Sequence, residues 1–263
     1  MYSDRKIHYK IIPSSKENAP NIILVMGYSG SMEAWPSVFL NEVSKNYQII
    51  LLDNLGTGFS PKPKEKESYQ ISELAKDLDS VIKSTEIKKF HLLGYSLGGC
   101  IALEYALNFQ SNNIESLTLL STTAGGNAYT SPGENILNKL ENPTGKDLLE
   151  LSRSIWELCL SVSNVEKHIE VLKSTVIYDK DKLTPRFALR NQLWAYKNFN
   201  RSEDMNFNFP VKIISGDKDP LTHAENSIRL SKLIKNSQLF ILNDCEHMPH
   251  IECPELLIEC LMK

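Results

Sequence analysis

The 263-residue sequence predicts an α/β fold with a mainly parallel central sheet, helices on both faces and one helical insertion. Short apolar runs alternate with helix-compatible stretches through the first half of the chain, which is typical of a doubly covered parallel sheet. This alternation stops between Gly125 and Phe209, where helical patterns take over, and strands return at Val211. With 41% hydrophobic and 23% charged residues, the composition is that of a globular chain large enough for a substantial core.

The expected strands are short apolar runs. Before the insertion we expect strands at residues 7–12, 22–26, 48–53, 89–94 and 116–121, and helices at residues 71–84 and 97–109. After it, the runs at residues 211–215 and 238–242 predict two further strands. Residues 1–124 and 210–263 are therefore expected to form one core domain, with residues 125–209 inserted as a helical lid or cap.

The insertion carries apolar residues at helical spacing, and Thr184-Pro185 has the composition of a helix start. The apolar positions are Leu148, Leu151, Ile155, Leu158, Cys159 and Val162. Packing against the core domain is the simplest role for such a stripe, but helices over the carboxyl edge of a sheet also leave some apolar side chains facing a ligand. On that argument Trp35, Trp156 and Trp194 are candidate pocket residues.

Residues 94–98 read Gly94-Tyr95-Ser96-Leu97-Gly98, between a predicted strand and a predicted helix. A sharp strand-to-helix turn of this G-x-S-x-G type projects a serine hydroxyl, and glycines fit where backbones come too close for a Cβ. The N–H of Leu97 would lie at the positive N-terminus of the helix. The alternative is a serine in an ordinary Gly-rich turn, but the flanking strand and helix favour Ser96 as a nucleophile.

A serine nucleophile of this type needs an acid and a histidine later in the chain, each just beyond a strand. The strand at residues 211–215 breaks at Gly216-Asp217-Lys218-Asp219-Pro220, and the strand at residues 238–242 precedes a loop that contains His247. We expect His247 to act as the general base and Asp219 to orient it, with Asp217 as the second candidate for the acid.

These motifs resemble the α/β-hydrolase superfamily, in particular its single-domain serine esterase, lipase and haloperoxidase-like branch. The resemblance extends over nearly the whole chain and includes the runs at residues 22–28 and 47–60. It implies an oxyanion hole made by the backbone N–H groups of Tyr28 and Leu97. It also favours Asp219 over Asp217, because residues 216–219 match the family pattern Gly-x-x-Asp. No cofactor is expected.

Three positions depart from the family pattern. Met26-Gly27 stands where His-Gly is usual, which leaves the N–H of Tyr28 available. Leu55 replaces an arginine that commonly braces the loop behind the active site, so the rigidity of that loop comes into question. Glu246 replaces the usual glycine before His247, and we expect its side chain to face water.

Charge and composition argue against several classes of protein. A formal net charge of -3 gives no basic surface for nucleic acid. No apolar run is long enough to span a bilayer, no Lys-rich amphipathic helix is present and residues 1–10 lack a signal-type apolar core, so we expect a cytoplasmic protein. Five cysteines without C-x-x-C pairs argue against a disulfide framework or a zinc site. Asp244, His247 and His250 form only a weak metal candidate, so no metal is expected.

The first functional hypothesis is a carboxylesterase that cleaves small to medium apolar acyl esters through an acyl-enzyme. The same triad can also serve thioester hydrolysis, lactone opening or carbon–carbon bond hydrolysis. A substrate carboxylate would call for a buried cation, for which Arg153, Arg186 and Arg190 of the insertion are candidates. From another class, a hydrolase-like small-molecule receptor that signals to a protein partner remains the alternative. The sequence leaves the oligomeric state open.

Overall fold

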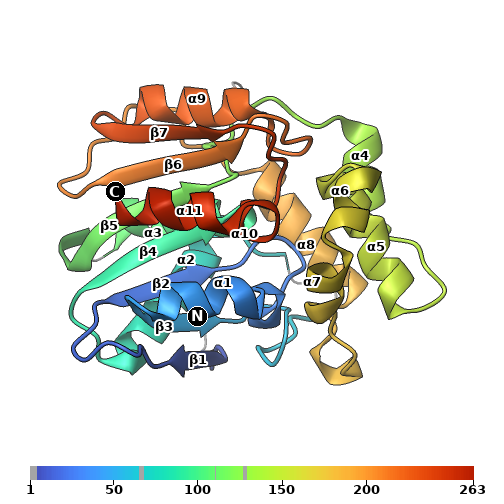
Figure 1. Cartoon of the computed structure of the whole chain (residues 1–263), viewed down its shortest axis with the longest axis horizontal. Coiled ribbons are helices and arrows are strands. Elements are labelled where there is room, and N and C mark those ends of the chain that lie inside the picture. Colours follow the sequence, from blue (N-terminus) through green and yellow to red (C-terminus); the bar gives the residue numbers. More distant parts are fainter. Residues whose placement is uncertain (1–4, 65–67, 110, 127–128) are drawn as a thin grey trace.

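The computed structural model describes residues 5–64, 68–109, 111–126 and 129–263. These residues contain one seven-stranded sheet in the order β1-β3-β2-β4-β5-β6-β7 (Figure 1). The strands are β1 (Tyr9–Ile12), β2 (Asn21–Val25), β3 (Gln48–Leu52), β4 (Phe90–Tyr95), β5 (Ile114–Leu120), β6 (Val211–Gly216) and β7 (Ser237–Leu242). β1 pairs with β3 in antiparallel register, whereas the other neighbouring strands are parallel. The predicted mainly parallel sheet is confirmed, with strand ends within two residues of those expected.

Helices cover both faces of this sheet. One apolar cluster joins the sheet to α2 (Ile71–Thr85), α3 (Leu97–Asn108) and α9 (His223–Leu233), and a second joins it to α1 (Ser37–Ser44) and α11 (Pro254–Met262). The sequence predicted α2 and α3 but not α1, α9 and α11. Proline at the start of α11 and just before α1 was the available signal, because proline favours the first turn of a helix.

The N-terminus of α2 shows how the sequence fixes one of these helices. The carboxylate of Glu73 accepts a hydrogen bond from the backbone N–H of Gln70 at 2.9 Å, as part of a capping box. Ile71, Leu74 and Leu78 are buried and recur at helical spacing, so one face of α2 packs against the sheet. This packing holds the layer that also contains α3, the helix that follows Ser96.

Between β5 and β6 the described residues form helices at one end of the sheet, on the right in Figure 1. They are α4 (Glu134–Glu141), α5 (Leu148–Cys159), α6 (Val162–Lys167), α7 (Ile169–Ser174) and α8 (Arg186–Lys197), with the 3-10 helix η3 (Lys180–Lys182). Their apolar cluster includes Trp156, Val165 and Leu172, and it also takes in Leu221 from the loop after β6 and Ile251 from the short helix at residues 249–252. Leu221 and Ile251 anchor the helices over the carboxyl ends of the strands.

Three short elements complete the described part of the chain: the 3-10 helices η1 (Met32–Ala34) and η2 (Ser111–Asn113), and α10 (Pro249–Glu252). Because β2, β4, β6 and β7 are parallel, the loops that follow them meet at the same edge of the sheet. These loops carry Tyr28, Ser96, Asp219 and His247. Among the helices of the described residues, none combines the length and the apolar character needed to cross a membrane.

Candidate active site

Ser96 occupies the turn between β4 and α3 with φ of 53°, in a region that residues other than glycine rarely adopt. A Cβ at Gly94 would lie 2.2 Å from the carbonyl oxygen of Gly98, and one at Gly98 would lie 2.1 Å from the carbonyl oxygen of Val25. Both contacts are too short for any side chain, which explains the two glycines. The backbone N–H of Ser96 donates to Leu120 O at 2.8 Å, and the hydroxyl of Thr122 donates to Ser96 O at 2.7 Å. The turn is therefore held from both sides.

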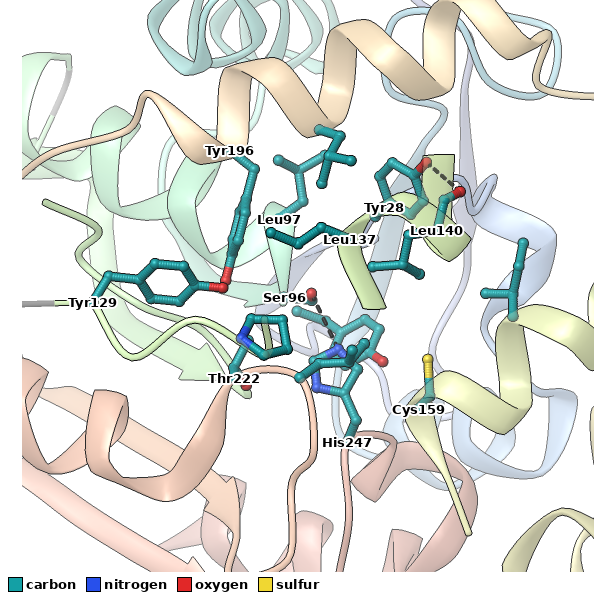
Figure 2. A pocket seen from close by; sticks show the side chains of 15 residues that line it. Tyr28, Ser96, Leu97, Tyr129, Leu137, Leu140, Cys159, Tyr196, Thr222 and His247 are labelled. Atoms are coloured by element: carbon teal, nitrogen blue, oxygen red, sulfur yellow. Dashed lines mark hydrogen bonds between the residues drawn. The ribbon is translucent and has the colours of Figure 1, made fainter. Parts of the chain in front are cut away.

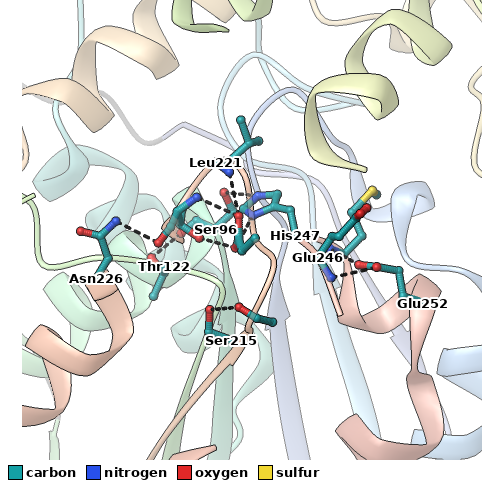
Figure 3. Close-up of polar contacts among 12 residues, drawn as sticks. Ser96, Thr122, Ser215, Leu221, Asn226, Glu246, His247 and Glu252 are labelled. Carbon is teal, nitrogen blue, oxygen red and sulfur yellow. Dashed lines mark hydrogen bonds and ion pairs between the residues drawn. The ribbon is translucent and has the colours of Figure 1, made fainter. Parts of the chain in front are cut away.

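The structure brings Ser96, His247 and Asp219 into one hydrogen-bonded chain (Figure 3). His247 Nε2 lies 3.2 Å from Ser96 Oγ, and His247 Nδ1 lies 2.8 Å from Asp219 Oδ2. All three residues are buried. Proton transfer between a serine and a histidine requires contact of this kind, with a carboxylate on the other ring nitrogen to fix its orientation.

The carboxylate of Asp219 is held by groups that follow it in the chain. Oδ1 accepts from the backbone N–H groups of Leu221 and Thr222, both at 2.8 Å, and Oδ2 accepts from the Thr222 hydroxyl at 2.6 Å. Burial raises the pKa of Asp219, but the charge of His247 and hydrogen bonds from His247 and Thr222 outweigh it, so the net pKa is lowered. Asp219 is therefore ionised. Thr222 was not predicted, although a hydroxyl residue three positions after a turn aspartate is a readable signal.

Asp217, the second candidate for the acid, lies elsewhere. Its side chain is exposed and accepts a hydrogen bond from the backbone N–H of Cys245 at 3.3 Å. The carboxylate that contacts His247 is that of Asp219.

The two residues whose N–H groups are expected to form the oxyanion hole, Tyr28 and Leu97, belong to segments that adjoin Ser96. Leu97 is the first residue of α3, where a backbone N–H has no partner within the helix. The loop after β2 approaches Ser96 closely, since a Cβ at Gly27 would lie 3.0 Å from Ser96 Cβ. Tyr28 turns its side chain toward α4 and donates its hydroxyl to Leu140 O at 3.0 Å. Tyr28, Ser96 and Leu97 line one cavity.

The loop that carries Leu55 in place of arginine is braced by other groups. Asn54 Nδ2 donates to Met26 O at 2.8 Å, which ties this loop to the turn before Tyr28. The carboxylate of Asp53 accepts from the backbone N–H groups of Met32 at 2.8 Å and Phe59 at 2.9 Å. Leu55 itself is buried. Amide hydrogen bonds thus hold the loop without a cation at residue 55.

The cavity at Ser96 is mainly apolar (Figure 2). Besides Tyr28, Ser96, Leu97 and His247, its lining includes Tyr95, Tyr129, Pro132, Leu137, Leu140, Ile155, Cys159, Leu193, Tyr196, Leu221 and Thr222. A second cavity adjoins it and shares Tyr28, Tyr95, Ile155 and Cys159. Among the described residues that line the two cavities, none is an aspartate, glutamate, lysine or arginine.

Burial favours the neutral forms of the tyrosines, of Cys159 and of His250 in these linings. Burial raises the pKa of Tyr129 to about 12 and raises the pKa of Tyr28, Tyr196 and Cys159 as well. In the second cavity burial lowers the pKa of His250 to about 3, so this imidazole is uncharged at neutral pH. These neutral groups therefore add no formal charge to the two linings.

The three tryptophans lie in different surroundings. Trp156 lines the second cavity. Trp35 is buried against Phe39, Tyr95 and His250 and does not line the cavity at Ser96. Trp194 is 43% exposed on the outer side of α8, because its neighbour Leu193 occupies the inner side and successive helix residues point about 100° apart.

The three candidate arginines of the insertion, Arg153, Arg186 and Arg190, lie outside both cavity linings. Arg153 pairs with Glu157 at 2.8 Å and with Glu166, and Arg190 pairs with Glu141 at 3.2 Å. Arg186 is exposed. None of them is among the described residues that line either cavity.

Glu246 differs from the expectation that it would face water. It is buried, and its carboxylate accepts a hydrogen bond from the backbone N–H of Ser161 at 2.6 Å, at the start of α6. His247 N also donates to Cys159 O at 3.3 Å. The loop with His247 is therefore bonded to the α5–α6 junction.

Glu252, which the sequence analysis did not single out, supports the same loop (Figure 3). Its carboxylate accepts from the backbone N–H groups of Glu246 and Met248, both at 2.9 Å, and these two residues flank His247. Burial raises the pKa of Glu252 to about 7, although the two backbone hydrogen bonds act in the opposite direction. A glutamate five residues after the histidine was the available signal.

The group Asp244, His247 and His250 does not converge. Asp244 pairs with Lys218 at 2.6 Å, His247 contacts Ser96 and Asp219, and the His250 ring packs against Tyr95 and Trp35. Within the described ranges, no group of three histidine, cysteine or acidic side chains is placed to hold a metal ion.

Comparisons with known proteins agree with this architecture. A family model described as alpha/beta hydrolase fold matches residues 20–254. The chain is 24% identical over 258 residues to a Bacillus subtilis protein named "Putative 2-succinyl-6-hydroxy-2,4-cyclohexadiene-1-carboxylate synthase", covering 95% of this chain and 92% of that protein. It is 23% identical to the "Putative carbamate hydrolase RutD" of Agrobacterium fabrum, covering 95% and 94%. The solved enol-lactonase from Burkholderia xenovorans LB400 superposes with a TM-score of 0.79 at 20% identity, covering 98% of this chain and 96% of that one.

Proposed function

The chain belongs to the alpha/beta hydrolase family, and from this premise we propose that it is a serine hydrolase that cleaves carboxylic esters with uncharged, apolar acyl groups. The observation that carries the proposal is the buried contact of His247 with Ser96 and Asp219, at the wall of a cavity whose described lining contains no aspartate, glutamate, lysine or arginine.

The first half of the proposed reaction forms an acyl-enzyme. His247 Nε2 removes the proton of the Ser96 hydroxyl while Ser96 Oγ attacks the ester carbonyl carbon. The backbone N–H groups of Tyr28 and Leu97 donate to the oxyanion that develops, and Asp219 stabilises the imidazolium. The tetrahedral intermediate then expels the alcohol, which takes its proton from His247.

In the second half, His247 takes a proton from a water molecule that attacks the acyl carbon. Collapse of this second intermediate breaks the bond to Ser96 Oγ, and His247 returns the proton to the serine. The products are one alcohol and one carboxylic acid for each ester and water consumed. The cycle requires no redox cofactor.

The substrate class in this proposal follows from the lining. A carboxylate within either cavity would lose its hydration without a cationic partner, because the insertion arginines lie outside and pair with glutamates or face solvent. The Bacillus subtilis relative is named for a carboxylate product, so we propose that this chain differs from it in the charge of its substrate. The apolar lining instead suits alkyl or aryl acyl groups.

We also propose that residues 125–209 act as a lid over a core of residues 1–124 and 210–263. Leu137, Leu140, Ile155 and Leu193 come from these helices and form one side of the cavity at Ser96. In this arrangement the sheet edge supplies the reactive groups, and the helices supply most of the surface that selects the acyl group. Residues 127 and 128 of this segment lie outside the described residues.

The test is steady-state hydrolysis of p-nitrophenyl esters, from acetate to long acyl chains, by the wild-type protein and by Ser96→Ala. We expect turnover of the neutral esters that is lost in the variant. The p-nitrophenyl monoester of succinic acid serves as the matched charged substrate and should be turned over much more slowly than the butyrate. A thioester and a p-nitrophenyl carbamate, tested in parallel, separate the ester preference from other acyl transfers.

Each negative result has a specific meaning. Preference for the succinate monoester would contradict the uncharged substrate class while leaving the serine mechanism in place. Turnover that persists in Ser96→Ala would contradict the mechanism. No turnover of any ester, with Ser96 still labelled by a fluorophosphonate, would replace the esterase proposal with a receptor or a hydrolase of another bond.

A further inference from the structure

Two cysteine thiols lie in contact beside His247. Cys245 precedes this histidine by two residues and Cys253 directly follows α10, so the pair brackets the loop that carries the histidine. Their Sγ atoms are 2.6 Å apart, and both residues are free thiols in the structure. The two side chains thus point toward each other, which is the geometric requirement for bridging two cysteines. We propose that Cys245 and Cys253 form a reversible disulfide under oxidising conditions and thereby cross-link the two ends of the histidine loop.

The approach of the thiols is fixed by the backbone on both sides. Cys245 O accepts from Lys218 N at 3.0 Å, and Cys245 N donates to Asp217 Oδ1 at 3.3 Å. Cys253 N donates to Pro249 O at 3.0 Å. The carboxylate of Glu252, next in sequence to Cys253, bonds the N–H of Glu246, next to Cys245 (Figure 3). The loop is already closed before any bond forms between the sulfur atoms.

The two thiols differ in access. Cys245 is 1% exposed, whereas Cys253 is half-buried. The contact with Cys253 and, as the second cause, burial both raise the pKa of Cys245, so this residue holds its proton at neutral pH. An oxidant from solvent therefore meets Cys253 first, and Cys245 acts as the resolving thiol.

With hydrogen peroxide as the oxidant, the chemistry takes two steps. The Cys253 sulfur attacks one peroxide oxygen, which breaks the O–O bond and gives a sulfenic acid and one water. The Cys245 sulfur then attacks the sulfenic sulfur and loses its proton, a second water leaves, and the S–S bond forms. In total, two thiols and one peroxide give one disulfide and two waters. Two equivalents of a small thiol reverse the oxidation by exchange.

The remaining cysteines provide internal controls. Cys100, Cys159 and Cys260 are buried and free. Cys260 is the sharpest control, since it follows Cys253 by seven residues on α11. A protease specific for glutamate would cut after Glu246, Glu252, Glu255 and Glu259, which places Cys245, Cys253 and Cys260 in three separate peptides.

The experiment treats the whole chain with one equivalent of hydrogen peroxide, denatures it, blocks free thiols with iodoacetamide and measures the intact mass. We expect the number of alkylated cysteines to fall from five to three, with full recovery after dithiothreitol. The glutamate digest should then show residues 226–246 linked to residues 253–255. Cys260→Ser should also lose two alkylated thiols, whereas Cys253→Ser should lose none and Cys245→Ser should form no disulfide.

A second measurement tests the cross-link without reference to activity. The oxidised wild-type protein should unfold at a higher midpoint than the reduced protein, by roughly 3–8 °C, because the bond restrains the unfolded chain. Cys253→Ser should show no such shift. Five alkylated cysteines after peroxide would overturn the proposal, as would an oxygenated Cys253 beside an alkylated Cys245, a link to Cys260 or a link between two chains. An unchanged or lowered midpoint would overturn the proposal that the disulfide restrains the histidine loop. None of these results depends on whether the chain hydrolyses esters.

Discussion

The sheet edge and the helices above it solve different physical problems. At the sheet edge, Ser96, Asp219 and His247 are joined by hydrogen bonds, and their neighbours hold them in turn through Thr122, Thr222 and Glu252. In the helical segment the residues that face the cavity are mainly apolar, and Arg153 and Arg190 form their ion pairs outside the cavity linings. Polar groups are therefore fixed where chemistry would occur, whereas the surface above them is mainly apolar.

This difference predicts how each region responds to substitution. Residues of one buried hydrogen-bonded network depend on one another, because each side chain orients the next. Removing one of them therefore impairs the function of all. Apolar lining residues act through shape and desolvation, so changing one of them alters the preference among substrates by a smaller factor. Activity should depend steeply on the sheet edge and more gently on the helices.

The largest effect should come from the serine and the histidine. Ser96→Ala and His247→Ala should each lower kcat/KM for a neutral p-nitrophenyl ester by about 10⁴-fold or more, because nucleophile and base act as one unit. The double variant should lose little beyond either single one. Steady-state kinetics on proteins with unchanged circular dichroism check this, and losses that multiply would mean that the two residues act independently.

The next effect should separate the two candidate acids. Asp219→Asn should lower kcat by about 10³- to 10⁴-fold, because an amide cannot hold the imidazole as the carboxylate does. Asp217→Asn is the matched control and should stay within about threefold of wild type, since that side chain is exposed and bonds only to a neighbouring loop in the described contacts. The reverse ranking in the same assay would assign the acid to Asp217.

A charge placed in the cavity tests the selectivity of the helices. Ile155→Arg would put a cation between the two cavities and should raise the ratio of succinate monoester to butyrate turnover by about 10- to 100-fold. Trp194→Arg adds the same charge to an exposed position and should leave this ratio unchanged. Equal changes in both variants would mean that the cavity lining does not set the charge preference.

Breaking the bond between the histidine loop and the helices should have a moderate effect on stability. Glu246→Ala leaves the N–H of Ser161 without its acceptor, which costs about 1–3 kcal/mol and lowers the unfolding midpoint by several degrees, roughly 2–8 °C. The exposed Glu255→Ala is the control and should shift the midpoint by less than about 1 °C. Thermal unfolding followed by circular dichroism measures both, and equal midpoints would show that water replaces the carboxylate at no cost.

The smallest effect concerns pH. The pKa of Glu252 is raised to about 7 in the folded protein, above the value of an unfolded glutamate. The folded state therefore binds more protons between these values, so its stability falls as pH rises toward 7. Glu252→Gln removes this titration, and its stability should decline less over the same range. Urea unfolding at several pH values compares the two slopes, and identical slopes would contradict the raised pKa.

Local patterns in the chain predicted much of the candidate site. Gly94 and Gly98 around Ser96 reflect a turn that leaves no room for a Cβ, and this requirement is visible in five residues. Asp219 and His247 could be placed because each follows an apolar strand, and parallel strands bring their carboxyl ends to one edge. Backbone geometry near a strand end is a local property, so sequence patterns record it.

The tertiary structure decided the features that depend on how segments face one another. The outward position of Trp194 follows from the rotation of α8, and the burial of Glu246 follows from the placement of Ser161, which lies 85 positions away in the chain. The contact between Cys245 and Cys253 depends on how α10 folds back against the loop that follows β7. The sequence by itself determined which residues the chain offers at the sheet edge. Only packing decided their partners from other segments, because the neighbours that a side chain meets across space leave no periodic signal along the chain.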